Sequence, residues 1–284
     1  MGQRALTSDW SVRIVSIESI RAFVLASMLG GVTGSVGAQE QDRISTDRPD
    51  FLTSPDVVGK GRFQIETGAL VQRDDPPGNM RTRTVTTPTL LRLGMTDNVE
   101  LQLETDGRVR TRETDLLTQT TVHTHGYADT AIAIKWHARK SDESKGTPGI
   151  GWVFKAMLPS ASRAYRGTGV RPAVIGAFEW DLPNDMALGA NAGMAYDNSD
   201  TGKRFFSGTL GAGLSKRLTD RLGIATEIVA QQLAQKKYGG NVAIADVGTT
   251  YLLTKNLQVD ALVGRGVTSE SPKYLFTVGI SARF

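Results

Sequence analysis

The sequence predicts an all-β fold, a transmembrane antiparallel up-and-down β-barrel of about twelve strands. Three observations support this prediction. Segments that alternate apolar and polar residues recur along the chain, short and long connections take turns between them, and the last segment ends on an aromatic residue.

The composition narrows the class. The 284 residues include no cysteine, which excludes a disulfide framework and thiolate metal sites. No apolar run of about 18 residues follows the N-terminal region, which argues against a helical membrane protein. The net charge of +4 and the lack of a basic patch interleaved with aromatics give no reason to expect nucleic acid binding.

The N-terminus has the pattern of a secretory signal. Arg4, Arg13 and Arg21 precede an apolar stretch, residues 22–28, and small residues continue to Ala38. We expect a signal peptide over 1–38, with a short buried helix as the alternative, and hence a Gram-negative outer-membrane location. A periplasmic segment, 39–61, and the barrel, 62–284, would follow.

The mature chain alternates with period two. Val99, Leu101 and Leu103 face one side of a predicted strand, for example, and Glu100 and Gln102 face the other. We expect strands near 62–73, 82–95, 98–107, 127–138, 149–158, 172–182, 186–196, 205–218, 221–231, 241–253, 257–264 and 273–284.

The connections sort by length. Turn-like triplets occupy 96–98, 183–185, 219–221 and 254–256, and longer polar stretches occupy 74–81, 108–126, 159–171, 197–204, 232–240 and 265–272, with 139–148 as the exception. Short periplasmic turns and long external loops are typical of outer-membrane barrels. The last strand carries the pattern that the barrel-insertion machinery reads in such proteins, so we expect an assembly signal at Tyr274, Phe276, Val278, Ile280 and Phe284.

Alternation assigns polar strand residues to the lumen, because a charge facing lipid costs about 2–4 kcal/mol at mid-membrane. The predicted lumen residues are Glu66, Arg92, Glu100, Glu104, Lys135, Lys155, Glu179, Glu227, Asp246 and Asp260, together with Asp106, Asp129, Asp181, Arg217 and Arg283. Two interpretations stay open: a salt-bridged filling of the barrel, or a polar path for a small solute.

Residues 43–59 contain Pro49 and Pro55, so this segment is a poor strand and a poor helix. We expect it to act as a gate through Asp47, Arg48, Asp50 and Phe51, with Glu100 as the nearest carboxylate for Arg48. The alternative is a disordered leader.

The remaining bases lie in predicted loops and turns, where they would meet outer-membrane lipid and lipopolysaccharide phosphates or plain solvent. They include Arg81, Arg83, Arg108, Arg110, Arg112, Arg163, Arg166, Arg171, Lys203 and Arg204. We expect no enzyme, cofactor or metal: His123 and His125 lie in a predicted loop without a third ligand, and His137 points inward.

Several stretches resemble an outer-membrane barrel family of transporters associated with the meta-pathway of phenol degradation. They are 45–51 (STDRPDF), 61–68 (GRFQIETG), 90–101 (LLRLGMTDNVEL), 129–135 and 246–260, and they span most of the mature chain. The resemblance implies a barrel and uptake, without establishing phenol chemistry. We therefore expect a channel for small solutes, with aromatic or hydrophobic molecules as candidates. The alternative is a filled, non-transport barrel with a structural or surface-interaction role.

Overall fold

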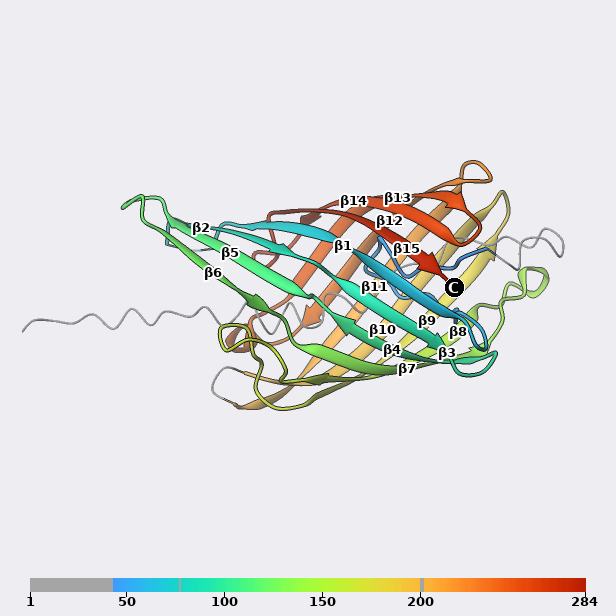
Figure 1. Cartoon of the computed structure of the whole chain (residues 1–284), viewed down its shortest axis with the longest axis horizontal. Coiled ribbons are helices and arrows are strands. Elements are labelled where there is room, and N and C mark those ends of the chain that lie inside the picture. The colour runs from blue at the N-terminus through green and yellow to red at the C-terminus, as the bar shows by residue number, and fades with distance from the viewer. Residues whose placement is uncertain (1–42, 77, 200–201) are drawn as a thin grey trace, which may run out of the picture.

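Antiparallel strands in sequence order build the protein, and the first and last of them pair to close a cylinder (Figure 1). The computed structural model describes residues 43–76, 78–199 and 202–284, so the predicted signal peptide and its cleavage site lie outside the described residues. No helix in this part of the chain is long and apolar enough to cross a membrane.

The described residues contain fifteen strand segments and two 3-10 turns. The strands are β1 (Phe63–Asp74), β2 (Met80–Thr86), β3 (Thr89–Gly94), β4 (Val99–Thr105), β5 (Arg108–Asp115), β6 (Thr121–Tyr127), β7 (Thr130–Arg139), β8 (Gly149–Leu158), β9 (Arg171–Leu182), β10 (Met186–Asn198), β11 (Arg204–Arg217), β12 (Leu222–Leu233), β13 (Val242–Thr254), β14 (Leu257–Gly266) and β15 (Tyr274–Arg283). The turns are η2 (Glu143–Lys145) and η3 (Lys236–Tyr238).

Three of the barrel strands are interrupted once each. β2 and β3 both pair with β1 and form the first interrupted strand. β5 pairs with β2 and β4 pairs with β3, which makes the second. β6 pairs with β5 and β7 pairs with β4, which makes the third. The breaks fall at Pro88, which has no N–H to donate, at Gly107, which has φ +61, and at Asp129. Each interrupted strand appears as two segments, so the fifteen segments make up twelve barrel strands. This confirms the predicted twelve-stranded closed barrel.

The region 108–126, expected as a loop, is instead a β-hairpin made of β5 and β6. That expectation was wrong because the outward side of this hairpin is charged rather than apolar, so the hydrophobic pattern does not reveal it. His123 and His125 consequently lie on β6 rather than in a loop.

The outward face of the wall is apolar and the inward face is polar. Side chains such as Leu101, Ile134 and Phe276 are exposed on the outside, while Glu100 and Lys135 are fully buried inside. Short turns gather at the end that carries the C-terminus, and the β2, β5 and β6 tips project from the other end (Figure 1). By the usual sorting of loop lengths, the C-terminal end faces the periplasm.

The junction of β1 and β15 runs over ten residue pairs, from Gln64 opposite Arg283 to Arg73 opposite Tyr274. Phe284 extends it, because its N–H and carbonyl both bond Phe63 and its ring stacks on the Phe63 ring with centroids 6.3 Å apart. The terminal residue is therefore part of the closure of the cylinder.

We expect deletion of Phe284 to lower the amount of folded barrel in the outer membrane and to leave secretion intact, because it removes two backbone hydrogen bonds and one ring contact at the junction. Heat-modifiable mobility on gels measures the folded fraction. Phe206→Leu, which changes an exposed ring away from the junction, is the control. Normal folded levels after the deletion would refute this role.

Candidate functional site

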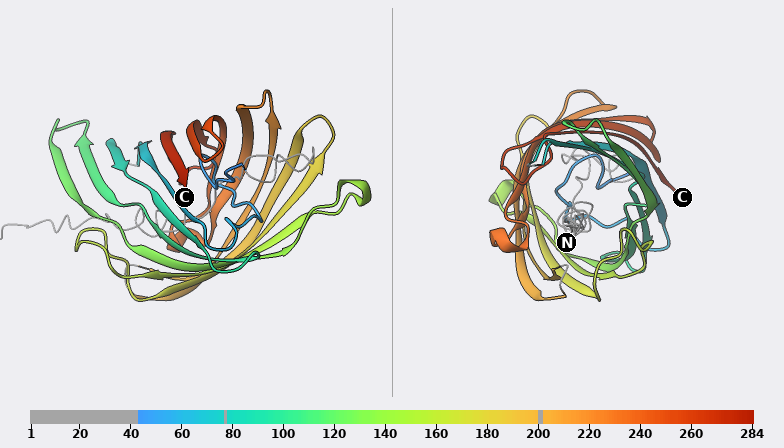
Figure 2. Two further views of the ribbon diagram at one scale, coloured as in Figure 1. Left: turned by 45° about the vertical axis from the view of Figure 1, so that its right-hand side comes forward. Right: turned by 90° about the vertical axis from the view of Figure 1, so that its left-hand side faces the viewer.

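Residues 43–62, which we name the inner segment, enter the barrel at the periplasmic end and lie inside the ring of strands (Figure 2, right). Asp47, Arg48, Asp50 and Phe51, the four predicted gate residues, are each at most 4% exposed. The peptide bond between Arg48 and Pro49 is cis.

The inner segment forms no strand, so its buried backbone groups need other partners. Side chains of the barrel wall supply them. Glu66 accepts the N–H groups of Asp47 and Arg48, Glu227 those of Phe51 and Leu52, Asn191 that of Thr53, and Glu100 that of Val58. These bonds come from β1, β12, β10 and β4, so the wall holds the segment from several sides.

Arg92 on β3 is the most connected wall residue. Its guanidinium donates to Glu100 at 2.8 and 3.2 Å and to Glu66 at 3.0 Å, and it is fully buried. It also donates to the carbonyl oxygens of Ser45 at 3.2 Å and Asp56 at 2.9 Å. One cation thus joins two wall carboxylates to two separate points of the inner segment, Ser45 and Asp56.

Asp47 pairs with Lys135 on β7. The Lys135 ammonium lies 2.9 and 3.0 Å from the two carboxylate oxygens of Asp47, which also accept from the Ser54 N–H and the Thr53 hydroxyl. Both charged groups are buried, so their attraction acts in a medium of low dielectric, and desolvation offsets part of the gain.

Arg48 binds the opposite wall. It forms a bidentate pair with Asp260 on β14, at 2.9 and 3.2 Å, and donates to the Thr277 hydroxyl on β15 at 2.9 Å. A Cβ at Gly279 would lie 2.2 Å from its Nε, and one at Gly68 would lie 2.7 Å from a terminal nitrogen. Only glycine leaves room for the guanidinium at these two wall positions.

The prediction that Arg48 pairs with Glu100 was wrong. Arg48 reaches Asp260 instead, because the segment turns toward β14 and β15 at this point and because Arg92, on the strand beside Glu100, already satisfies that carboxylate.

The inner segment also contributes to an apolar cluster inside the barrel. Phe51 and Leu52 pack with side chains from five wall strands, namely Leu70, Val229, Val242, Ile244, Leu262 and Leu275. Alternation in the sequence indicates only the charged residues of the lumen. The structure shows that one side of it, over β12 to β15 and β1, is apolar.

Three carboxylates meet beside this cluster. One oxygen from each of Asp50, Glu227 and Asp246 lies within 4.8 Å of the others, and both oxygens of Asp246 lack a hydrogen-bond partner among the described residues. Carboxylates so close repel one another unless a proton or a cation comes between them. Oxygen ligands of this kind suit Ca²⁺ or Mg²⁺.

In the part of the chain that the structure describes, most of the other predicted lumen residues form no hydrogen bond with the inner segment; Arg283 is the exception, because its guanidinium donates to the Arg43 carbonyl at 3.0 Å. Glu104 and Lys155 form a buried ion pair within the wall, at 2.5 Å, and Glu179 is half-buried with one oxygen lacking a partner among the described residues. Asp106 and Asp129 are buried, Asp181 accepts from Ser141, Arg217 pairs with Asp185, and Arg283 donates to Asn256.

Sequence reasoning missed several polar partners. Asn191, Gln64 and Gln258 each bond the inner segment, but uncharged amides did not stand out among the charged residues. Arg171, assigned to a loop, lies on β9 and pairs inside the barrel with Asp129. His137 does point inward, and its Nδ1 lies 2.9 Å from the Pro55 carbonyl.

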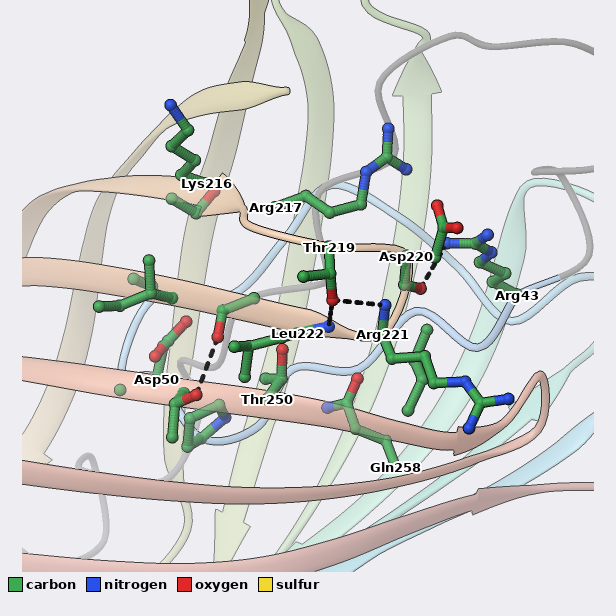
Figure 3. A pocket seen from close by; sticks show the side chains of 18 of the residues that line it. Arg43, Asp50, Lys216, Arg217, Thr219, Asp220, Arg221, Leu222, Thr250 and Gln258 are labelled. Atoms are coloured by element: carbon green, nitrogen blue, oxygen red, sulfur yellow. Dashed lines mark hydrogen bonds between the residues drawn. The ribbon is translucent and has the colours of Figure 1, made fainter. Parts of the chain in front are cut away.

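A small pocket opens between the inner segment and the turn that joins β11 to β12 (Figure 3). Its lining includes Arg43, Asp50, Asp220 and Arg221, and Arg43 donates to the Asp220 carbonyl at 2.9 Å. The volume is about 60 Å³, far below the ~300–1,000 Å³ of pockets that enclose small molecules. With the inner segment seated, this pocket has no room for a solute of ordinary size.

Comparison with solved structures identifies the same fold. The COG4313 outer membrane channel from Pseudomonas putida F1 is similar with a TM-score of 0.58 and 12% identity, covering 80% of this chain and 97% of that one. The KdgM porin in complex with disordered oligogalacturonate has a TM-score of 0.50 and 12% identity, and the match covers 78% of this chain and 99% of that one. The translocator domain of the autotransporter NalP from Neisseria meningitidis has a TM-score of 0.50 and 14% identity, and the match covers 80% of this chain and 89% of that one. No curated protein matches the chain in sequence.

The closed twelve-stranded wall, the apolar outer face and these relatives define an outer-membrane β-barrel. The chain belongs to the family described as "Putative MetA-pathway of phenol degradation", which it matches over residues 46–284. The match begins within the inner segment, so this segment is part of the family pattern.

We expect Lys135→Met to loosen the inner segment, because it removes the nearer of the two cations beside the buried Asp47 carboxylate and leaves Arg92 at 3.9 Å. The loss should be at most about 3–5 kcal/mol. The bond after Phe51, buried in the native protein, should then become a cleavage site for chymotrypsin, which prefers large apolar residues. N-terminal sequencing of the products measures this.

Lys155→Met is the matched control, since it breaks the buried pair with Glu104 and does not touch the inner segment. Adding Asp47→Asn to Lys135→Met should restore part of the protection, because a neutral amide then replaces the buried carboxylate that has lost its nearer cation. Equal cleavage of the Lys135 and Lys155 variants would contradict the assignment.

Proposed function

We propose that the protein is an outer-membrane channel for small solutes, aromatic or hydrophobic ones in particular, and that the inner segment is its gate. The observation that carries this proposal is the way the segment is held, by polar side chains from strands on every side of the barrel. A segment seated in this way blocks the path until it moves.

The bonds that hold the gate are suited to release. Besides the apolar contacts of residues such as Phe51, Leu52 and Val58, the segment is held by hydrogen bonds and ion pairs, which water can replace when it leaves. A segment that merely filled the barrel would be held more simply by apolar side chains, because buried ion pairs contribute little net stability.

The solute class follows from the apolar cluster and the family. A solute that displaced Phe51 and Leu52 would meet Leu70, Ile244 and Leu262 on the wall, next to polar groups that fix orientation. The family description refers to phenol degradation, and a phenol-like ring with one polar group matches this mixture. No catalytic role is proposed, and the fold relatives with TM-scores of 0.50 or above include a channel and a porin.

We expect a disulfide between Leu52→Cys and Gly211→Cys to lock the gate. A Cβ at Gly211 would lie 2.6 Å from a methyl carbon of Leu52, so two cysteine sulfurs fit into the space of that side chain. The chain has no other cysteine. Oxidised protein in planar bilayers should show no open steps, and reduction should bring them back.

Deletion of residues 43–59 completes this test and should give larger or more frequent conductance steps. Heat-modifiable mobility on gels should show that the barrel of this variant still folds. A filled, non-transport barrel predicts silence from the oxidised, reduced and native proteins alike. Unchanged conductance in the deletion variant would rule out the gate.

We expect liposomes that contain the deletion variant to swell faster with phenol or benzoate than with a sugar of similar size, because the apolar wall favours the ring. Leu262→Asn in the same background should reduce this preference several-fold, since it places an amide in the apolar cluster. Ile132→Asn changes an outward-facing residue and is the control. Equal swelling rates for all solutes would be consistent with a channel but would refute the proposed solute class.

A further inference from the structure

The β2–β5–β6 end of the barrel carries a row of basic side chains on its outer side. Arginines 81 and 83 on β2, arginines 108, 110 and 112 on β5, and histidines 123 and 125 on β6 are all exposed. We name these seven residues the arginine face. They alternate with inward residues such as Val109 and Thr111, and Thr111 accepts from the Tyr165 hydroxyl on the inner side.

Strand register sets these basic side chains directly beside one another. Arg83 lies opposite Arg112, Arg112 lies opposite His123, and on the other side Arg83 lies opposite Arg73 of β1. The result is one row of four basic residues across four strands. Like charges in directly opposed positions destabilise a sheet, so the row is costly unless anions lie against it.

Among the described residues of this row, only Arg73 has an anionic partner, because Asp75 accepts from its guanidinium at 3.2 Å. Across residues 43–76, 78–199 and 202–284, no carboxylate forms an ion pair with any of the five arginines of the face. The acids nearby are already engaged: a hydrogen bond from Lys273 lowers the pKa of Asp75, and Asp115 accepts the N–H groups of Leu117 and Thr118 at 2.8 and 3.1 Å.

Exposed tyrosines lie in register with the arginine face. Arg73, in the same row, is opposite Tyr274 of β15, and Arg108 is opposite Tyr127 of β6. Both tyrosines are exposed, at 48% and 62%, and exposed aromatic rings mark the membrane interface of such barrels. Along β2 the next outward residue after Arg83 is Val85, which lies opposite Val71 of β1 on one side and opposite Arg110 of β5 on the other.

We propose that the arginine face binds the phosphate groups of lipopolysaccharide in the outer leaflet. An arginine fork binds phosphate with two parallel hydrogen bonds, and neighbouring strands about 4.8 Å apart bring several forks to one phosphate. The external end and the headgroup level select this lipid, because the periplasmic ends of the strands lie at the other rim of the barrel (Figure 1). The inference is independent of the proposed channel function.

The test uses full-length protein refolded in detergent, free of bacterial lipid, and titrated with lipid A carrying two phosphates. The variant Arg81→Gln, Arg83→Gln, Arg110→Gln and Arg112→Gln should bind at least about tenfold more weakly than the native protein, since each such charge near an anionic surface contributes appreciably. Native protein should lose affinity to a similar degree for lipid A with both phosphates removed.

The matched control is Lys60→Gln, Lys140→Gln, Lys216→Gln and Arg221→Gln, which removes four exposed charges from other parts of the chain and should leave the affinity unchanged. Heat-modifiable mobility verifies folding, and Arg110→Gln with Arg112→Gln alone serves if the fourfold variant does not fold. Equal affinity of native and variant protein, equal affinity for lipid with and without phosphate, or an equal loss in the control would each overturn the proposal.

Discussion

The backbone of the inner segment must be hydrogen-bonded although it lies inside a barrel and forms no strand. Its ends bond the backbone of the wall, Ile44 at Lys255 and Gly61 at Gly94, and the residues between them need side chains as partners. This constraint determines where the polar residues of the wall have to be. Glu66, Glu100, Glu227 and Asn191 accept backbone N–H groups of the segment, and Arg92 donates to two of its carbonyl groups. The wall takes the place of a neighbouring strand, with side chains instead of a peptide ladder.

The same constraint accounts for the balance of charge at the periplasmic end. Buried carboxylates inside the barrel need compensation wherever they carry charge, because the medium has a low dielectric. Arg92 compensates Glu66 and Glu100 together, while Lys135 and Arg48 compensate Asp47 and Asp260. Asp50, Glu227 and Asp246 form no ion pair with a cation among the described residues, and they lie close together.

The sequence predicts the wall well and its contents poorly. Period-two alternation identifies the inward face, and it is sufficient to assign Glu66 and Lys135 to the lumen. It carries no information on partners, because Lys135 meets Asp47 from 88 residues away and the inner segment has no period of its own. The β5–β6 hairpin was missed for a related reason. Its outward face carries arginine instead of apolar residues, so the hydrophobic alternation stops although the strands continue.

Arg48 occupies a particular place on the wall. Gly68 and Gly279, which make room for its guanidinium, are cross-strand partners at the junction of β1 and β15. This junction joins the two ends of the barrel chain, so it can close only after the whole wall has been made. The guanidinium therefore spans a seam, and any parting of the first and last strands would disturb its seat. The fit of Arg48 thus depends on the register of the two strands that close the cylinder.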